Sequence, residues 1–228
     1  MPIPQHNIPP VFLIAGLTGA GKTALIQYLI QHKVQALDLE SLCRHDGSVF
    51  ATLQYPSQPS SYEFHKQLLK QWNSLDAAKP VYIESELIKL GRITLPGWLY
   101  EKMSNAPVIW LDTSKNLRLE RIASFIRHAN PVLFCDCLSR LDKKLGEENY
   151  RLAMKHFENG AIEQLAEILL NYYDQVPGYR YPAERIILNL PVTNTYLQPL
   201  AETLIAATQL HCDSAGVSFS KQLHHPQQ

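Results

Sequence analysis

The sequence lacks the paired cysteines of disulfide-rich and zinc-binding proteins. Its four cysteines are Cys43, Cys135, Cys137 and Cys212, and no two of them form a C-x-x-C pair. A chain of 228 residues is long enough to fold around a hydrophobic core without disulfide bonds. Because reduced thiols are the ordinary state of cysteines inside the cell, we expect a cytoplasmic protein with free thiols.

The sequence also lacks an excess of charge and a long apolar run. Lysine plus arginine and aspartate plus glutamate number 21 each, so the formal net charge is zero and gives no global sign of a nucleic-acid-binding protein. Any contact with RNA must then come from a local basic patch. No apolar run approaches the roughly 20 residues of a membrane span. Residues 1–10 are polar and proline-rich, unlike a signal peptide, and we expect no membrane segment.

What the sequence does contain is a complete phosphate-binding loop. Residues 16–23 fit the pattern G-x-x-x-x-G-K-[ST], between an apolar run at 11–15 and a helical pattern at 24–30. Its glycines let phosphate oxygens approach the backbone N–H groups at the positive end of the following helix. We expect Lys22 to neutralise the terminal phosphates and the Thr23 hydroxyl to ligate Mg²⁺. The predicted phosphate-binding residues are Gly16, Leu17, Thr18, Gly19, Ala20, Gly21, Lys22 and Thr23, with Arg121 and Arg127 further along the chain.

The other apolar segments predict an α/β fold of the P-loop NTPase type. Five strands are expected at 11–15, 34–39, 80–86, 107–112 and 185–190, and their alternation with helical patterns predicts a mainly parallel sheet covered on both faces. We expect the strand order 2-3-1-4-5, a helical insertion after the fourth strand, and a ligand at the carboxyl ends of the strands. The expected organisation is a flexible N-terminus at 1–10, a single domain at 11–210 and a disordered polar tail at 211–228.

Acidic residues end two of the expected strands. Asp38 ends the second, and Glu84 and Glu86 end the third, where P-loop proteins carry an acid beside the magnesium ion. We predict Lys22, Asp38, Glu84 and Glu86 as catalytic residues, and Thr23 and Glu84 as metal-binding residues. A solvated carboxylate pair at a strand end is the alternative interpretation of Glu84 and Glu86.

Basic and aromatic residues in the expected insertion suggest further contacts. Arg118, Arg121 and Arg127 share one helical pattern, in the place where P-loop kinases carry phosphate-clamping arginines, although a solvated helix face explains them equally well. The candidate RNA-binding residues are His45, Arg140, Lys143, Lys144, Tyr172 and Tyr173. The tyrosines would stack on bases, or else they belong to the core and its rim.

Several short motifs follow the P-loop along the chain. They are Asp38-Leu39-Glu40, His45-Asp46-Gly47-Ser48 with Phe50, Gln58-Pro59, Ile83-Glu84-Ser85-Glu86 with Leu90-Gly91, Leu95-Pro96 and Tyr172-Tyr173-Asp174. In this order and spacing, residues 11–181 resemble the P-loop domain of tRNA 2-selenouridine synthase.

The resemblance implies an enzyme that replaces the sulfur of 2-thiouridine, at the wobble position of tRNA, with selenium. It implies geranylation of the sulfur from geranyl diphosphate, followed by displacement with selenium from selenophosphate. The family also carries an N-terminal rhodanese domain with a catalytic cysteine. Because residues 1–10 alone precede the first expected strand, we expect a separately encoded rhodanese protein as a partner, together with tRNA carrying 2-thiouridine. The usual His-Arg-Gly-Ser of the family has Asp46 in place of its arginine, and a carboxylate would repel a phosphate.

Three functions fit these residues. The first is a P-loop domain for wobble 2-thiouridine modification, by geranyl transfer, by selenation with a separate rhodanese partner, or by both. Its P-loop would bind the diphosphate of geranyl diphosphate or of a nucleotide. The second is a stand-alone small-molecule kinase or NTPase that uses Mg²⁺ with ATP or GTP. The third is a non-catalytic nucleotide-binding module that works through a partner.

Overall fold

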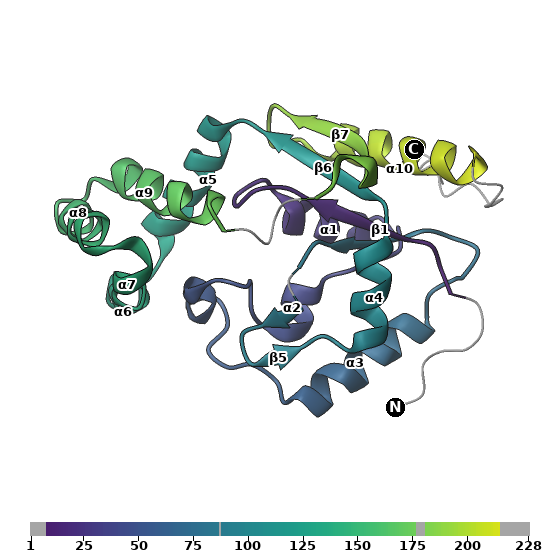
Figure 1. The fold of residues 1–228 in the computed structure, drawn as a ribbon, viewed down its shortest axis with the longest axis horizontal. Coiled ribbons are helices and arrows are strands. Elements are labelled where there is room, and N and C mark those ends of the chain that lie inside the picture. Colours follow the sequence, from purple (N-terminus) through teal and green to yellow (C-terminus); the bar gives the residue numbers. More distant parts are fainter. Residues whose placement is uncertain (1–7, 87, 177–180, 215–228) are drawn as a thin grey trace.

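A five-stranded parallel sheet forms the centre of the computed structural model, which describes residues 8–86, 88–176 and 181–214 (Figure 1). Its strands are β1 (Val11–Ala15), β2 (Ala36–Leu37), β3 (Val81–Glu84), β6 (Val108–Thr113) and β7 (Ile186–Val192). Their order is β2-β3-β1-β6-β7, which confirms the predicted order 2-3-1-4-5 because β6 and β7 are the fourth and fifth predicted strands. In the central strand, Leu13 lies opposite Ile83 on one side and Val108 on the other.

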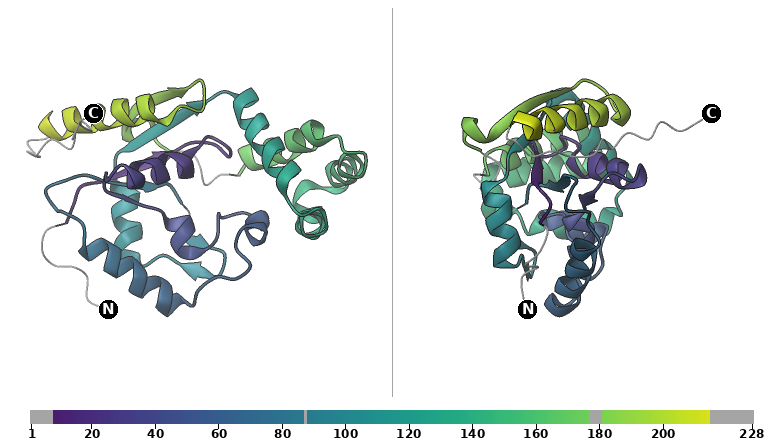
Figure 2. Two further views of the ribbon diagram at one scale, coloured as in Figure 1. Left: turned by 180° about the vertical axis from the view of Figure 1, so that it is seen from behind. Right: turned by 90° about the vertical axis from the view of Figure 1, so that its right-hand side faces the viewer.

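The side chains of the strands alternate between two separate cores. Val11 and Leu13 enter one core, whereas Phe12 and Ile14 enter the other, as the two-residue period of a strand requires. The first core is covered by α2 (Leu39–Cys43), α3 (Ser61–Asn73) and α4 (Gly97–Asn105), and the second by α1 (Lys22–Gln31) and α10 (Leu197–Ser214). Figure 2 shows these layers from two further sides. The sheet is therefore buried on both faces, as the sequence predicts.

The predicted insertion is a group of five helices between β6 and β7, which we call the arm. They are α5 (Lys115–His128), α6 (Pro131–Ser139), α7 (Asp142–Leu145), α8 (Glu147–Glu158) and α9 (Ile162–Asp174). In Figure 1 the arm stands to the left of the sheet. Its helices bury a third core, to which Phe134, Leu138 and Leu165 belong and which also includes Phe50 from outside the arm.

Several short elements were not predicted. Helix α2 directly follows β2, and a short 3₁₀ helix, η1 (Val49–Leu53), follows α2. Strands β4 (Lys89–Leu90) and β5 (Ile93–Thr94) form a separate antiparallel hairpin around Gly91, which has a φ of 58°. A short 3₁₀ helix, η3 (Ala183–Arg185), leads into β7. Elements of two to five residues are too short to show a hydrophobic period.

The predicted boundaries also need three corrections. The second predicted strand, at 34–39, is reduced to Ala36–Leu37, because Leu39 begins α2. The third predicted strand ends at Glu84, so Glu86 lies beyond β3. Helix α10 extends to Ser214, past the predicted start of the tail at residue 211. The rest of the predicted tail, 215–228, and most of the predicted N-terminal segment, 1–7, lie outside the described residues.

The four cysteines are free thiols, as predicted. Cys43, Cys137 and Cys212 are buried, and Cys135 is half-buried. Among the helices in the described part of the chain, none combines the length and the apolarity that crossing a bilayer requires.

Candidate functional site

The P-loop joins β1 to α1 and has the backbone geometry of an anion-binding loop. Gly19 and Gly21 have φ values of 77° and 100°, a backbone conformation that residues with a side chain rarely adopt. A Cβ atom on Gly16 would lie 2.8 Å from the Cβ of Ala20, so that position also requires glycine. Gly21 directly precedes α1, and the loop therefore lies at the positive end of the helix dipole.

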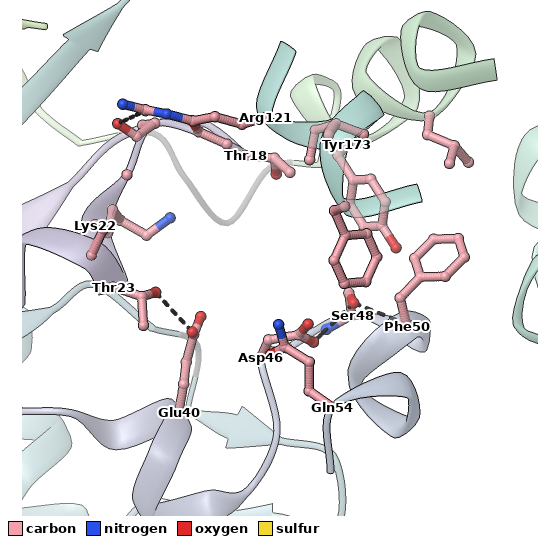
Figure 3. A pocket seen from close by; sticks show the side chains of 18 of the residues that line it. Thr18, Lys22, Thr23, Glu40, Asp46, Ser48, Phe50, Gln54, Arg121 and Tyr173 are labelled. Carbon is pink, nitrogen blue, oxygen red and sulfur yellow. Dashed lines mark hydrogen bonds between the residues drawn. The ribbon is translucent and has the colours of Figure 1, made fainter. Parts of the chain in front are cut away.

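A cavity of about 480 Å³ opens beside the P-loop, within the range of small-molecule sites. One end is polar and the other is apolar, and Figure 3 shows Lys22 and Glu40 facing Phe50 and Tyr173 across the space. The polar end is lined by the P-loop from Thr18 to Thr23, with Glu40, Asp46 and Glu86. The other end is lined mostly by apolar side chains, which are those of Phe50, Ile122, Phe125, Ile126, Phe134, Leu169 and Leu170. Three polar side chains, those of Ser48, Gln54 and Tyr173, lie beside Phe50 there (Figure 3).

At the polar end, the Thr23 hydroxyl donates a hydrogen bond of 2.8 Å to Oε2 of Glu40. Because the hydroxyl gives its proton to Glu40, its lone pairs are available to a cation, and the pair fits Mg²⁺. Nζ of Lys22 donates to the carbonyl of Gly16 at 3.3 Å. Burial raises the pKa of Glu40. Glu40 is the last residue of the Asp38-Leu39-Glu40 motif, but it was not predicted as a site residue. Helix α2 directs its side chain toward Thr23, and this helix was not predicted.

No group of three or more histidine, cysteine, aspartate or glutamate side chains within the described residues is placed to hold a metal ion. This finding agrees with the usual chemistry of Mg²⁺, which keeps several water molecules and takes one or two protein ligands plus substrate phosphates.

The structure does not bring Asp38 and Glu84 into the cavity. Oδ1 of Asp38 accepts a hydrogen bond of 2.8 Å from the backbone N–H of Ser41, and Oε1 of Glu84 accepts one of 2.9 Å from that of Glu40. Both carboxylates thus satisfy N–H groups in the first turn of α2. Neither is among the residues that line the cavity. Glu84 is fully buried, and burial, followed by the charges of Glu40 and Asp38, raises its pKa well above the ordinary value.

Glu86 does line the cavity, in the segment after β3. Burial raises the pKa of Glu86 to about 8, while the nearby charge of Lys22 acts in the opposite direction. Of the four residues predicted to be catalytic, the cavity therefore contains Lys22 and Glu86.

The three arginines of α5 have different surroundings. Nη1 of Arg121 donates to the carbonyls of Gly19 and Ala20 at 2.9 and 2.7 Å, so this side chain lies against the P-loop. Burial lowers the pKa of Arg121. Arg127 instead forms an ion pair with Glu163 and is not part of the cavity lining. Residues six apart on a helix of 3.6 residues per turn point in different directions, which separates the two predicted phosphate ligands.

Arg118 connects the arm to the P-loop. Its guanidinium forms two hydrogen bonds with the carboxylate of Asp174, at 2.8 and 3.0 Å, and Nη1 also donates to the carbonyl of Thr18 at 3.2 Å. The Arg118 side chain is 6% exposed and that of Asp174 is 25% exposed. The last residue of the Tyr172-Tyr173-Asp174 motif thus holds α5 and α9 together beside the loop.

The candidate RNA-binding residues lie in three separate places. Tyr173 lines the cavity, and Tyr172 contacts it edge to face with ring centroids 5.0 Å apart. Burial raises the pKa of both tyrosines. Nδ1 of His45 accepts a hydrogen bond of 2.9 Å from the N–H of Gly47, and burial lowers the pKa of this histidine. Three exposed basic residues, Arg140, Lys143 and Lys144, lie at the end of α6 and in α7.

Asp46 stabilises the loop that leads from α2 to η1. Its Oδ1 accepts hydrogen bonds from the N–H and the hydroxyl of Ser48, at 2.9 and 2.8 Å. Oγ of Ser48 in turn accepts a hydrogen bond of 3.0 Å from the N–H of Phe50. The carboxylate that replaces the usual arginine therefore supports the position of Phe50 at the apolar end of the cavity.

Comparisons with known proteins agree with the motifs. Residues 9–187 match the family model described as the tRNA 2-selenouridine synthase AAA domain. The tRNA 2-selenouridine synthase of Nitrosomonas eutropha is 38% identical over 128 residues, which cover 54% of this chain and 32% of that protein. That of Shewanella pealeana is 33% identical over 217 residues, which cover 79% of this chain and 57% of that protein. The chain thus spans about half the length of the curated relatives it matches. A solved gluconokinase from Sinorhizobium meliloti 1021 aligns with 92% of this chain and 98% of its own, at 11% identity and a TM-score of 0.43.

Proposed function

We propose that this protein acts in the modification of 2-thiouridine in tRNA, because the chain belongs to the family of the tRNA 2-selenouridine synthase AAA domain. The step we assign to the described residues is the transfer of a geranyl group from geranyl diphosphate to the sulfur of the base. This is the first of the two steps that the resemblance implies.

The observation that carries this proposal is the two-ended cavity. A geranyl diphosphate carries a strongly charged diphosphate at one end of a short hydrocarbon chain, and the cavity offers a P-loop at one end and an apolar lining at the other. A nucleotide would place its base and ribose among Phe125, Ile126 and Leu169, and its hydrogen bonds at that end would depend on Ser48, Gln54 and Tyr173, which also line the cavity.

The transfer needs no protein nucleophile, because the thiouridine sulfur is itself a good one. The sulfur forms a bond with C1 of the geranyl group, while the bond between C1 and the diphosphate oxygen breaks and its electron pair leaves with the diphosphate. The N3 proton of the base passes to water. Lys22 and the N–H groups of the P-loop would stabilise the charge that develops on the diphosphate. Thr23 and Glu40 would hold a Mg²⁺ ion, which supplies further positive charge to the leaving group.

The complete reaction also requires a tRNA substrate and a source of selenium. We propose tRNA carrying 2-thiouridine as the macromolecular substrate, with the exposed basic residues of α6 and α7 as the candidate contact. The selenium step needs the rhodanese cysteine that the resemblance implies, and we propose a rhodanese-domain protein as the partner that supplies it.

A second candidate function is a kinase or NTPase, and the placement of Arg121 favours it. This arginine lies at the edge of the P-loop, where an arginine can stabilise a transferring phosphoryl group. Under this alternative the P-loop would bind ATP or GTP with Mg²⁺, and the apolar end of the cavity would have no role in the reaction.

Thermal unfolding in the presence of Mg²⁺ separates the two functions. We expect geranyl diphosphate to raise the melting temperature, since a ligand at 100 times its dissociation constant adds about 2.7 kcal/mol to the stability of the folded state. Geraniol, which lacks the diphosphate, and the Lys22→Ala variant, which keeps its circular dichroism spectrum, should show no shift. A shift with ATP or GTP and none with geranyl diphosphate would refute the proposal.

A further inference from the structure

The end wall of the cavity is built from two aromatic rings that come from different parts of the chain. Phe50 is in η1, which follows α2, and Phe134 is in α6 of the arm. Their rings stack with centroids 4.9 Å apart and planes 17° from parallel. Phe50 is 5% exposed and Phe134 is 1% exposed, although both line the cavity.

The depth of the cavity follows from the two helices that form its sides. Arg118 of α5 pairs with Asp174 of α9 beside the P-loop, and Arg127 of α5 pairs with Glu163 at the opposite end of α9. The helices are therefore antiparallel, and the lining residues of α5 from 121 to 126 advance by about 7.5 Å away from the loop. A chain bound by its diphosphate at the P-loop would run along these residues toward the stacked rings.

The two rings are held in place from behind. Phe157 of α8 stacks on Phe134 with ring centroids 5.3 Å apart, and Phe157 itself does not line the cavity. On the other side, the hydrogen bonds from Ser48 to Asp46 and from the N–H of Phe50 to Ser48 fix the start of η1. Because both rings are supported, the wall cannot move aside without breaking these contacts.

We propose that Phe50 and Phe134 determine the length of the prenyl chain that the site accepts. The pair limits the cavity to a short chain, and removing either ring opens space for a longer one. This inference rests on the proposed function, because it takes the diphosphate of the ligand to lie on the P-loop.

Binding of three diphosphates to the wild-type protein and its variants tests the proposal. Calorimetry with Mg²⁺ would compare dimethylallyl, geranyl and farnesyl diphosphate, whose chains grow by one isoprene unit at a time. In Phe50→Ala and in Phe134→Leu we expect the ratio of farnesyl to geranyl affinity to rise by about tenfold or more, since even one methylene in an apolar pocket changes discrimination by roughly 10–200-fold. Leu165→Ala is the matched control, because Leu165 is buried in the same core and does not line the cavity.

A variant that fills the cavity tests the same idea in the opposite direction. Leu169→Phe adds bulk to the lining without removing support from the wall, so it remains informative if a cavity-opening variant fails to fold. We expect it to shift the preference from geranyl toward dimethylallyl diphosphate by a similar factor.

Different results would overturn the selection of chain length and the proposed function. If the wild-type protein binds geranyl diphosphate and chain preference is unchanged in the folded variants, the wall does not select length and this inference is wrong, while the proposed function stands. A shift in Leu165→Ala as large as in Phe134→Leu would also overturn it, because the effect would then come from general loosening of the arm. If the wild-type protein binds ATP or GTP and no prenyl diphosphate, the proposed function fails.

Discussion

Replacing Asp174 with asparagine tests whether one largely buried ion pair holds α5 and α9 together beside the P-loop. The substitution removes the negative charge but keeps the shape of the side chain, and it leaves the Arg118 guanidinium, 6% exposed, without its counter-charge. Loss of one partner of a fully buried pair costs about 3–5 kcal/mol. Since Asp174 is 25% exposed and Thr18 still accepts one hydrogen bond, we expect a loss of about 2–3 kcal/mol in the free energy of unfolding.

Urea denaturation of the ligand-free protein measures this loss directly. A fall in melting temperature of about 4–12 °C should accompany it, because 1 kcal/mol corresponds to about 2–4 °C for a chain of this size. The matched control is Glu167→Gln, which breaks the exposed pair between Lys115 and Glu167 on the same two helices. Exposed pairs contribute about 0–1 kcal/mol, so the control should change little.

Asp174→Asn must lose clearly more unfolding free energy than Glu167→Gln. Equal and small losses, below about 0.5 kcal/mol in both, would show that Arg118 and Asp174 do not form a buried pair in solution. A loss in Asp174→Asn that disappears when Arg118 is also replaced by methionine would support the pair, because the uncompensated buried charge is then removed.

Three further predictions concern other parts of the site. Arg121→Ala should weaken binding of the diphosphate ligand by about tenfold, the equivalent of one charge-assisted hydrogen bond, whereas Arg127→Ala should leave calorimetric binding unchanged. Because burial raises the pKa of Glu86 from 4.5 to about 8, the folded state holds a proton that the unfolded state loses, so the unfolding free energy should fall as pH rises through this range. Urea titrations at several pH values should show a smaller slope in Glu86→Gln, and an identical slope would contradict the assignment. Gly91→Ala should lower stability by about 1–3 kcal/mol in the same assay, because its φ is 58° and its Cβ would collide with the Gln58 side chain.

The P-loop was predictable because all of its determinants are local. The glycines, Lys22 and Thr23 are contiguous, and the flanking strand and helix have clear apolar patterns. The sheet order followed from the family of folds that this loop indicates, and the five strands each carried their own apolar run.

The roles of the carboxylates were harder to predict because they depend on a helix of five residues. Without α2, nothing in the sequence shows that Asp38 and Glu84 satisfy its first N–H groups or that Glu40 points to Thr23. Two acids at strand ends then look equally available to a metal ion.

The apolar end of the cavity was not predictable for a different reason. Phe50, Phe125, Phe134 and Leu169 come from four separate elements, and each one alone has the pattern of an ordinary core residue. Only their arrangement around a space next to the P-loop distinguishes them from the core, and a single sequence contains no signal for that arrangement.

The ion pair between Arg118 and Asp174 also makes the arm an exchangeable unit. These residues stand near the two ends of one uninterrupted stretch of chain, and the pair brings both ends together at the edge of the sheet. The stretch between them contains most of a core of its own. A chimaera that receives the arm of another family member would therefore have to match two sets of contacts, the hydrogen bonds of Arg118 and Arg121 to the P-loop carbonyls and the stacking on Phe50, while the strand order of the sheet would stay untouched.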